Sequence, residues 1–186
     1  HNRCRRQRQM CIRDRHGFTE TPSLKRSNAF DLVAEECHAV RRDVGLLDIT
    51  GFSRFEVTGP NAEAWLTRVL AGRMPKPGKV ALAPMLSPEG RMKGDLTVFN
   101  WGDGRWWIMG SYYLRAWHMR WFSQYAETGV EVRDLGEEWA GFSLAGPKSK
   151  QVIEQLTDGD IGQLGFMGCG TFDIGLLRTR ISRLSV

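Results

Sequence analysis

One short pattern occurs twice in this chain: an alternating strand, a Gly-Pro pair and an amphipathic helix. The first copy starts at Phe55 and reads FEVTGP followed by NAEAWLTRVL; the second starts at Phe142 and reads FSLAGP followed by KSKQVIEQL. Glycine relieves the steric strain of a sharp corner, and proline suits the first turn of a helix, where no amide donor is needed. The copies lie further apart than the roughly 20–50 residues of a solenoid repeat. The pattern therefore predicts two related α+β halves, with the groove between them as a natural place for a ligand.

Length and composition allow one full domain with its own core. The chain has 186 residues, of which 41% are hydrophobic, and a chain of this length buries enough surface to fold. No apolar run approaches the roughly 20 residues that cross a bilayer, so we expect no contact with a membrane.

The positive charge is confined to the start of the chain. Residues 1–26 hold eight of the 26 basic residues and only two of the 21 acidic ones, so the rest of the chain is close to neutral. A basic arm that binds RNA is one hypothesis. We favour the alternative that no nucleic acid is bound, because the charge does not lie on the predicted folded part.

Residues 1–23 have no apolar periodicity and are predicted to be a disordered, non-native leader. The stretch RQRQMCIRDR resembles the translation of a sequencing adapter. A transit peptide is the biological alternative, since the stretch is rich in arginine and poor in acidic residues, but an amphipathic apolar face is absent.

The cysteines do not predict a metal site, because no pair has C-x-x-C spacing. An alternative zinc site within the leader would use His1, Cys4, Cys11 and His16. Cys37 and Cys169 are expected to be small buried or neutral thiols, which fits a reducing compartment. We therefore expect a cytoplasmic protein, or one of the mitochondrial matrix in a eukaryote.

The order of predicted elements indicates an α+β fold over residues 24–186. A helix from Asn28 has an apolar face, and strands and hairpin turns then alternate with the two Gly-Pro helices and with a long helix over SYYLRAWHMRWFSQYAE. We expect its apolar stripe to hold Leu114, Trp117, Trp121, Phe122 and Tyr125. The β-α-β-β-α-β order predicts duplicated ferredoxin-like halves with antiparallel sheets. No G-x-G-x-x-G follows a strand, so this segment is not expected to bind a dinucleotide.

Asp95 is the candidate catalytic residue. It follows Gly94 in a predicted strand in which Leu96 and Val98 face one way and Asp95, Thr97 and Phe99 the other. A carboxylate beside a glycine can orient an amine or stabilise a cation where a ligand approaches the backbone. The alternative is a solvated aspartate, or one paired with a neighbouring basic side chain.

The histidines and aromatic residues are weaker candidates. His38 and His118 lie on predicted helices with no serine or cysteine to complete a triad, so we expect capped or surface histidines. An aromatic cluster could stack a flat heterocycle, but its helical and strand spacing favours a core. Its members are Trp106, Trp107, Tyr112, Tyr113, Trp117 and Trp121.

Several segments in fixed order resemble one family. They are EECHAVRRDVGLLDIT, FEVTGPNAEAWLTRVL, PMLSPEGRMKGDLTVF, YYLRAWHMRWF and LAGPKSKQVIEQL. Together they resemble the folate-binding, aminomethyltransferase-like domain of the glycine-cleavage T-protein, over roughly residues 24–186. They look still more like its version at the C-terminal end of dimethylglycine and sarcosine dehydrogenases.

The resemblance implies a role in one-carbon transfer to tetrahydrofolate. In the dehydrogenases a flavin domain oxidises an N-methyl group to an iminium, and this domain supplies the folate that captures the carbon. The implied partners are folate, the iminium or aminomethyl donor, and the flavin domain of the parent chain, with FAD held only in that missing upstream domain. Asp95 occupies the place of the family's catalytic acid. The positions implied to line the folate are Phe52, Leu82, Met85, Gly110, Ser111 and Tyr113.

This sequence departs from the T-protein pattern at three of these places. Gly94 replaces the first of two adjacent acids, Leu82 replaces an aromatic residue, and Gly110 replaces an asparagine. The chain also ends before the motif whose carboxylate would hold the pterin, so we expect a fragment with little or no activity of its own. The alternatives are a fragment of a stand-alone glycine-cleavage aminomethyltransferase, and a non-catalytic folate-binding protein of the same fold.

Overall fold

The computed structural model describes residues 19, 21, 23–136, 138–158 and 161–184. Most of the predicted leader, including the alternative zinc ligands, lies outside these residues. The chain divides into two compact units, a smaller one of residues 1–47 and 142–151 and a larger one of residues 48–141 and 152–186. All of the predicted site residues lie in the larger unit.

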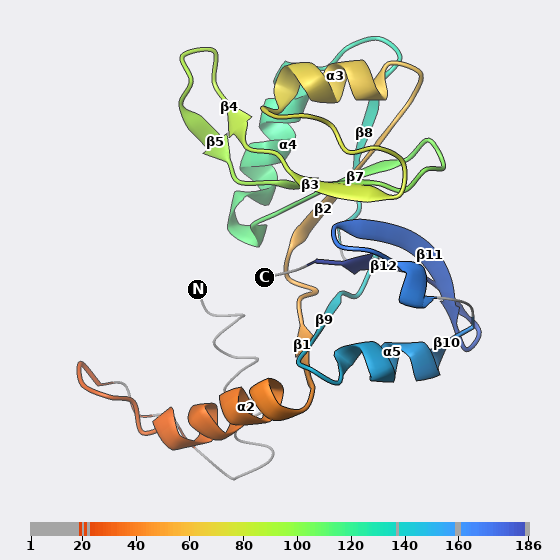
Figure 1. Cartoon of the computed structure of the whole chain (residues 1–186). Helices are drawn as coiled ribbons and strands as arrows, with labels where there is room; N and C mark the ends of the chain where they lie inside the picture. The colour runs from red at the N-terminus through yellow and green to blue at the C-terminus, as the bar shows by residue number, and fades with distance from the viewer. Residues whose placement is uncertain (1–18, 20, 22, 137, 159–160, 185–186) are drawn as a thin grey trace. The chain divides into compact units, whose positions relative to one another are not determined.

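The larger unit is built on one antiparallel sheet, with β6 and β7 near its middle (Figure 1). Its eight strands follow the order β10-β11-β3-β6-β7-β2-β8, and β12 pairs with β11. Their bounds are β2 (Ser53–Thr58), β3 (Lys79–Leu82), β6 (Thr97–Asn100), β7 (Trp106–Gly110), β8 (Glu131–Asp134), β10 (Thr157–Asp158), β11 (Gly168–Ile174) and β12 (Leu177–Arg183). A separate small hairpin joins β4 (Met85–Leu86) to β5 (Met92–Gly94).

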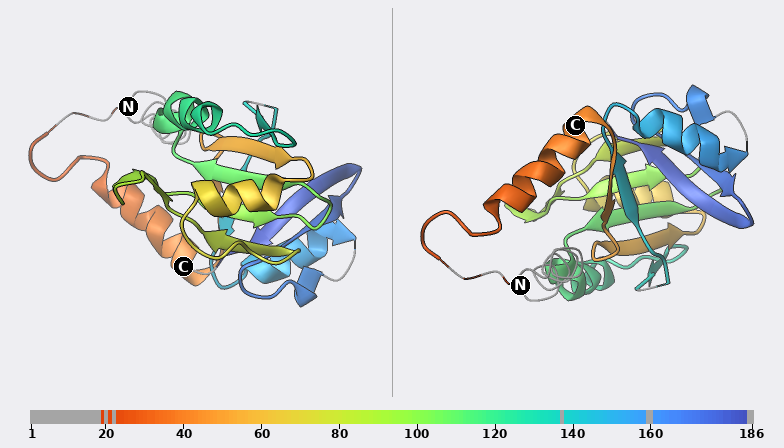
Figure 2. Two further views of the ribbon diagram at one scale, coloured as in Figure 1. Left: turned by 90° about the horizontal axis from the view of Figure 1, so that it is seen from above. Right: turned by 90° about the horizontal axis from the view of Figure 1, so that it is seen from below.

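Two helices cover one face of this sheet. α3 (Ala62–Val69) and α4 (Arg115–Gln124) bury Trp65, Leu66 and Phe122 against strand residues such as Phe55 and Ile108. In the left view of Figure 2, α3 lies over the strands. Phe122 meets Phe55 and Trp65 edge to face, with ring centroids 5.2 and 5.8 Å apart. Such aromatic pairs add to the free energy gained by burial alone.

A second apolar cluster lies on the opposite face of the sheet. Val80, Phe99 and Trp107 form it together with Leu135 and Cys169. Because alternate residues of a strand point to opposite faces, Val98 and Phe99 belong to different clusters. Burial raises the pKa of the Cys169 thiol to about 11, which confirms a buried neutral thiol at that position.

The two Gly-Pro corners have the same local geometry, which confirms the repeat at the level of the backbone. Gly59 and Gly146 have φ angles of +110° and +116°. The backbone N–H of the second residue after each glycine donates a hydrogen bond to a carbonyl oxygen far along the chain. Asn61 donates to Gly129 at 3.1 Å, and Lys148 donates to Asp43 at 3.0 Å. A methyl group on either glycine would collide with that same carbonyl oxygen.

The smaller unit contains α2 (Phe30–Arg42), the paired strands β1 (Gly45–Asp48) and β9 (Phe142–Ala145), and the start of α5 (Ser149–Leu156). The predicted helix from Asn28 is confirmed, with its start two residues later, at Phe30. Its apolar face does not form part of a core, because no residue of α2 is buried. Cys37 is exposed, so of the predicted buried or neutral thiol the buried alternative does not hold at this position.

The α+β class with antiparallel sheets is confirmed, but the strand order differs from the ferredoxin-like pattern. Three strands of the main sheet, β3, β6 and β7, lie between α3 and α4. The sheet order places two strands, β6 and β7, between β2 and β3, whereas a split β-α-β unit places one strand between the two that flank its helix. The reason is local: β6 and β7 are joined by a tight hairpin that adds one reversal of the chain. Within the described residues, no helix has the length and apolarity to cross a bilayer.

Candidate functional site

The strand register places four of the predicted site residues at one end of a single sheet face. Leu82 pairs with Thr97, Thr97 with Met109, and Met109 with Arg54. Residues paired directly across an antiparallel sheet point to the same face, and so do residues two positions along. Asp95, Ser111 and Phe52 each lie two positions from a member of this row, just past the strand ends, and we therefore expect them on the face that carries Leu82.

Asp95 is exposed and lies between β5 and β6 rather than inside a strand. Among the described residues its carboxylate makes no recorded hydrogen bond or ion pair. The predicted alternative of a pair with Lys93 is not seen, because the Lys93 ammonium lies over the rings of Trp117 and Trp121, 5.8 and 5.6 Å from their centroids. The carboxylate is therefore available to a ligand.

The predicted folate-lining residues divide into two groups. Phe52, Leu82 and Tyr113 are exposed, Leu82 at 69% and Tyr113 at 62%, and Ser111 is half-buried. Met85 is fully buried in the cluster under α3, and Gly110 is buried with Leu96 and His118 on that side. Any contact of Met85 or Gly110 with a ligand on the exposed face would therefore come from the backbone.

Arg54 holds the loop that carries Phe52. Its guanidinium is buried and donates hydrogen bonds to the carbonyl oxygens of Ile49, Thr50 and Phe52 at 3.2, 3.1 and 3.1 Å. Burial lowers the pKa of Arg54, while the negative charge of Asp48 acts in the opposite direction. Three charge-assisted bonds to backbone carbonyls fix the loop more firmly than packing alone would.

Glu56 is a second buried charged group on this face, two residues further along β2. It accepts hydrogen bonds from Trp107 Nε1 at 3.2 Å, Arg105 Nη1 at 3.3 Å and Arg133 Nη2 at 3.4 Å. Burial acts to raise the pKa of Glu56, but the Trp107 hydrogen bond and the charges of the two arginines outweigh it and hold the pKa below its ordinary value. Its partners are all supplied by the protein, so Glu56 stabilises the fold rather than offering a free carboxylate.

His118 is buried directly beneath the predicted site, so its prediction as a capped or surface histidine is wrong. The side chain is 1% exposed, and neither ring nitrogen has a hydrogen bond of normal geometry to a described residue. Burial lowers the pKa of His118 below 6.5, although the nearby Lys93 backbone opposes the shift. His118 and Phe122 lie one helical turn apart and therefore share a helix face. Because Phe122 was predicted to lie in the apolar stripe, this spacing was the sequence signal that His118 is buried as well.

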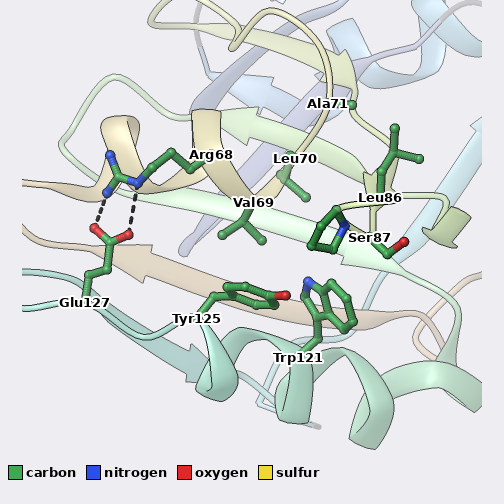
Figure 3. A pocket seen from close by; sticks show the side chains of 10 residues that line it. Arg68, Val69, Leu70, Ala71, Leu86, Ser87, Trp121, Tyr125 and Glu127 are labelled. Carbon is green, nitrogen blue, oxygen red and sulfur yellow. Dashed lines mark hydrogen bonds and ion pairs between the residues drawn. The ribbon is translucent and has the colours of Figure 1, made fainter. Parts of the chain in front are cut away.

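A pocket lies elsewhere in the larger unit, where α3, β4 and α4 meet (Figure 3). It has a volume of about 430 Å³. Trp121, Tyr125 and Val69 face it, and at one end the Arg68 guanidinium is paired with the Glu127 carboxylate. None of the predicted site residues lines this pocket. No cluster of three or more acidic, histidine or cysteine side chains suited to a metal ion occurs within the described ranges.

Comparison with known proteins identifies a domain family. The family model described as the GCVT N-terminal domain matches residues 7–185. Dimethylglycine dehydrogenase from Mus musculus is 28% identical over 169 residues, which cover 88% of this chain and 19% of that protein. An aminomethyltransferase from Geobacillus kaustophilus is 28% identical over 137 residues, covering 73% of this chain and 38% of that protein.

One solved structure supports the same fold. The glycine cleavage system aminomethyltransferase T from Bartonella henselae superposes with a TM-score of 0.70 at 19% identity, over 86% of this chain and 45% of that one. The chain thus spans less than half the length of each of these proteins.

Proposed function

Because this chain belongs to the family of the GCVT N-terminal domain, we propose that it is the tetrahydrofolate-binding, one-carbon-transfer domain of a flavin-linked dehydrogenase that removes N-methyl groups. The similarity to dimethylglycine dehydrogenase over 88% of the chain supports this parent. A stand-alone aminomethyltransferase is the second candidate, since the aminomethyltransferase from Geobacillus kaustophilus is also 28% identical to this chain.

The observation that carries the proposal is the unpaired carboxylate of Asp95 beside exposed apolar side chains on one sheet face. Folate has a flat, partly apolar ring system with an amine that attacks the one-carbon donor. Leu82, Phe52 and Tyr113 offer exposed apolar surface for such a ring, and aromatic side chains favour flat ligands. The residues present therefore suit the cofactor.

Bound tetrahydrofolate would supply the amine that accepts the one-carbon unit. Asp95 would orient that amine and stabilise the positive charge of the iminium donor. A carboxylate already fixed in place stabilises a developing cation better than mobile water does, because no reorganisation is needed. Arg54 would keep the Phe52 loop in position through its three backbone contacts.

Tetrahydrofolate binding to this chain, measured by calorimetry, tests the proposal. We expect Leu82→Asp to weaken binding about tenfold or more, because a charge would be buried against the ring. Leu177→Asp is the matched control, since Leu177 is 72% exposed on β12 and lies outside the candidate site; we expect unchanged affinity. Failure of the unsubstituted chain to bind at millimolar concentration would contradict the proposal.

The role of Asp95 calls for the same substitution in the parent enzyme. We expect Asp95→Asn to abolish transfer to folate while oxidation of the amine by an artificial acceptor continues. Equal loss of both activities would instead indicate a structural role.

A further inference from the structure

Two glycines of the candidate site pack against one histidine ring. A methyl group added at Gly94 would lie 2.9 Å from His118 Nε2, and one added at Gly110 would lie 3.2 Å from Cε1 and 3.3 Å from Nδ1. Leu96 shares the contact, at 3.3 Å from the first methyl position and 2.7 Å from the second. Each glycine immediately precedes a residue of the proposed site, Gly94 before Asp95 and Gly110 before Ser111.

The backbone itself does not require glycine at these two positions. Neither Gly94 nor Gly110 is among the glycines with positive φ, so other residues could adopt the same conformation. The restriction comes from the space that the imidazole and Leu96 occupy. The histidine ring, together with Leu96 at both glycines and Met85 at Gly94, therefore limits how closely β5 and β7 approach α4.

Packing rather than hydrogen bonding holds the ring in place. The imidazole has ring contacts with Phe55 and Phe122, at centroid distances of 6.3 and 6.4 Å. Both ring nitrogens are buried, and neither has a hydrogen bond of normal geometry to a described residue. A buried polar group without a partner is unfavourable for stability, and a native structure that keeps one calls for an explanation. An apolar side chain of similar size would fill the core without this penalty.

We propose that His118 is a positioning residue for the folate site, acting through its contacts with Gly94 and Gly110 on the placement of Asp95 and Ser111. The inference rests on the proposed function, because it assigns His118 to the site formed by those two residues. Successive residues of a strand point to opposite faces of the sheet, so Gly94 faces α4 while Asp95 faces the other way, and the same holds for Gly110 and Ser111. A shift of either glycine away from α4 therefore moves the residue that follows it outward on the exposed face. His118 never touches the ligand.

The test compares three substitutions and one double variant of the full chain. His118→Ala removes the ring, and Gly94→Ala pushes against it. The double variant combines the added methyl group with the space left by the ring. Leu66→Ala is the matched control, because Leu66 is equally buried in the core under α3 and has no recorded contact with the His118 ring or with a glycine.

Two measurements are made on each protein. Residual dipolar couplings of the Asp95 and Ser111 amides report bond orientation without ligand, and they are insensitive to the ring current that the imidazole itself produces. Tetrahydrofolate affinity is measured on the same samples. We expect His118→Ala and Gly94→Ala each to change both couplings and to weaken binding about tenfold, since sites are sensitive to displacements of about 1 Å.

The double variant separates positioning from general loss of stability. We expect its couplings and its affinity to return toward the unsubstituted values relative to Gly94→Ala alone, because the methyl group no longer meets the ring. Leu66→Ala should leave the two couplings unchanged. Couplings in His118→Ala and Gly94→Ala that match those of Leu66→Ala, or a double variant no better than Gly94→Ala, would overturn the inference.

Two further outcomes are decisive. If the unsubstituted chain does not bind tetrahydrofolate, the proposed function fails, yet the dipolar couplings still decide whether His118 positions Asp95 and Ser111. If His118→Ala does not fold, the comparison of Gly94→Ala with Leu66→Ala decides the same question.

Discussion

Three buried polar side chains of the larger unit meet their bonding requirements in different ways. Glu56 accepts hydrogen bonds from three other side chains, and Arg54 donates three to backbone carbonyls. His118 has no hydrogen bond of normal geometry to a described residue. Of the three, His118 is thus the group whose protonation the fold opposes most directly, because an added charge would find no acceptor of normal geometry.

The stability of the protein should accordingly depend on His118 near neutral pH. Its pKa is lowered from 6.5 in the folded state, while the unfolded chain keeps the ordinary value. Above pH 6.5 both states are neutral at this residue and its contribution to stability is fully present. Below pH 6.5 the unfolded state binds a proton first, so the unfolding free energy falls, by at most about 1.4 kcal/mol per pH unit, until the folded-state pKa is reached.

Urea unfolding between pH 5.5 and 7.5 measures this effect. His118→Leu should show a shallower decline of the unfolding free energy with falling pH than the unsubstituted chain. The range lies above the ordinary pKa of 4.5 for glutamate, which limits the contribution of Glu56. Parallel declines in both proteins would show that His118 titrates normally.

At the scale of elements, the Gly-Pro corners connect sequence to structure most directly. Gly59 has a φ of +110°, and a methyl group there would lie 2.3 Å from the Gly129 carbonyl oxygen. We therefore expect Gly59→Ala to destabilise the larger unit by more than the roughly 1–2 kcal/mol of a left-handed conformation. Gly90→Ala is the matched control, since Gly90 also has positive φ, at +76°, but has open space around it.

Chemical denaturation of the two variants separates strain from collision. Gly90→Ala should lose only the conformational part, and Gly59→Ala clearly more. Equal losses would mean that the Gly129 carbonyl moves aside at little cost. Gly146→Ala is expected to behave like Gly59→Ala within the smaller unit, because its methyl group would lie 2.5 Å from the Asp43 carbonyl oxygen.

Elements governed by local sequence could be predicted, whereas the faces of some helices could not. The turn at Ser87–Gly90 is confirmed by the hydrogen bond from the Gly90 amide to the Ser87 carbonyl at 2.8 Å. The stripe predicted for the long helix is wrong in part, because Leu114 and Trp117 are exposed and His118 is buried. A 3-10 turn, η1 (Tyr112–Leu114), precedes α4. The predicted stripe assumed α-helical spacing from Leu114 onward, so this turn rotates the stripe away from the face that is buried.

At the scale of the whole molecule, the sheet register could not be predicted from the sequence. Asp95 and Leu82 were selected by resemblance. Their common face follows from the pairing of Leu82 with Thr97, which depends on contacts between distant strands. The role of His118 was missed for the same reason, since its neighbours Gly94 and Gly110 belong to β5 and β7. Long-range packing thus assembles the candidate site from residues that are individually unremarkable in sequence.

The two units should also differ in local stability. α2 has 13 residues and none of them is buried, whereas the shorter α3 buries Ala62, Trp65, Leu66 and Val69. Isolated helices of about 12–15 residues are marginal in water, and helices in proteins are stabilised chiefly by packing. Amide groups in α2 should therefore open by local fluctuations, while those in α3 open with the larger unit.

Native-state hydrogen exchange tests this difference within one sample. We expect protection factors in α2 to be about 100-fold or more below those in α3, because a helix without buried residues opens at little free-energy cost. Val33, on the exposed apolar face of α2, and Leu66 in α3 are suitable probes. Comparable protection at the two positions would mean that the apolar face of α2 is covered in solution, for instance by a second copy of the chain. Repeating the measurement at tenfold lower protein concentration would identify that case, because only protection that depends on association falls with dilution.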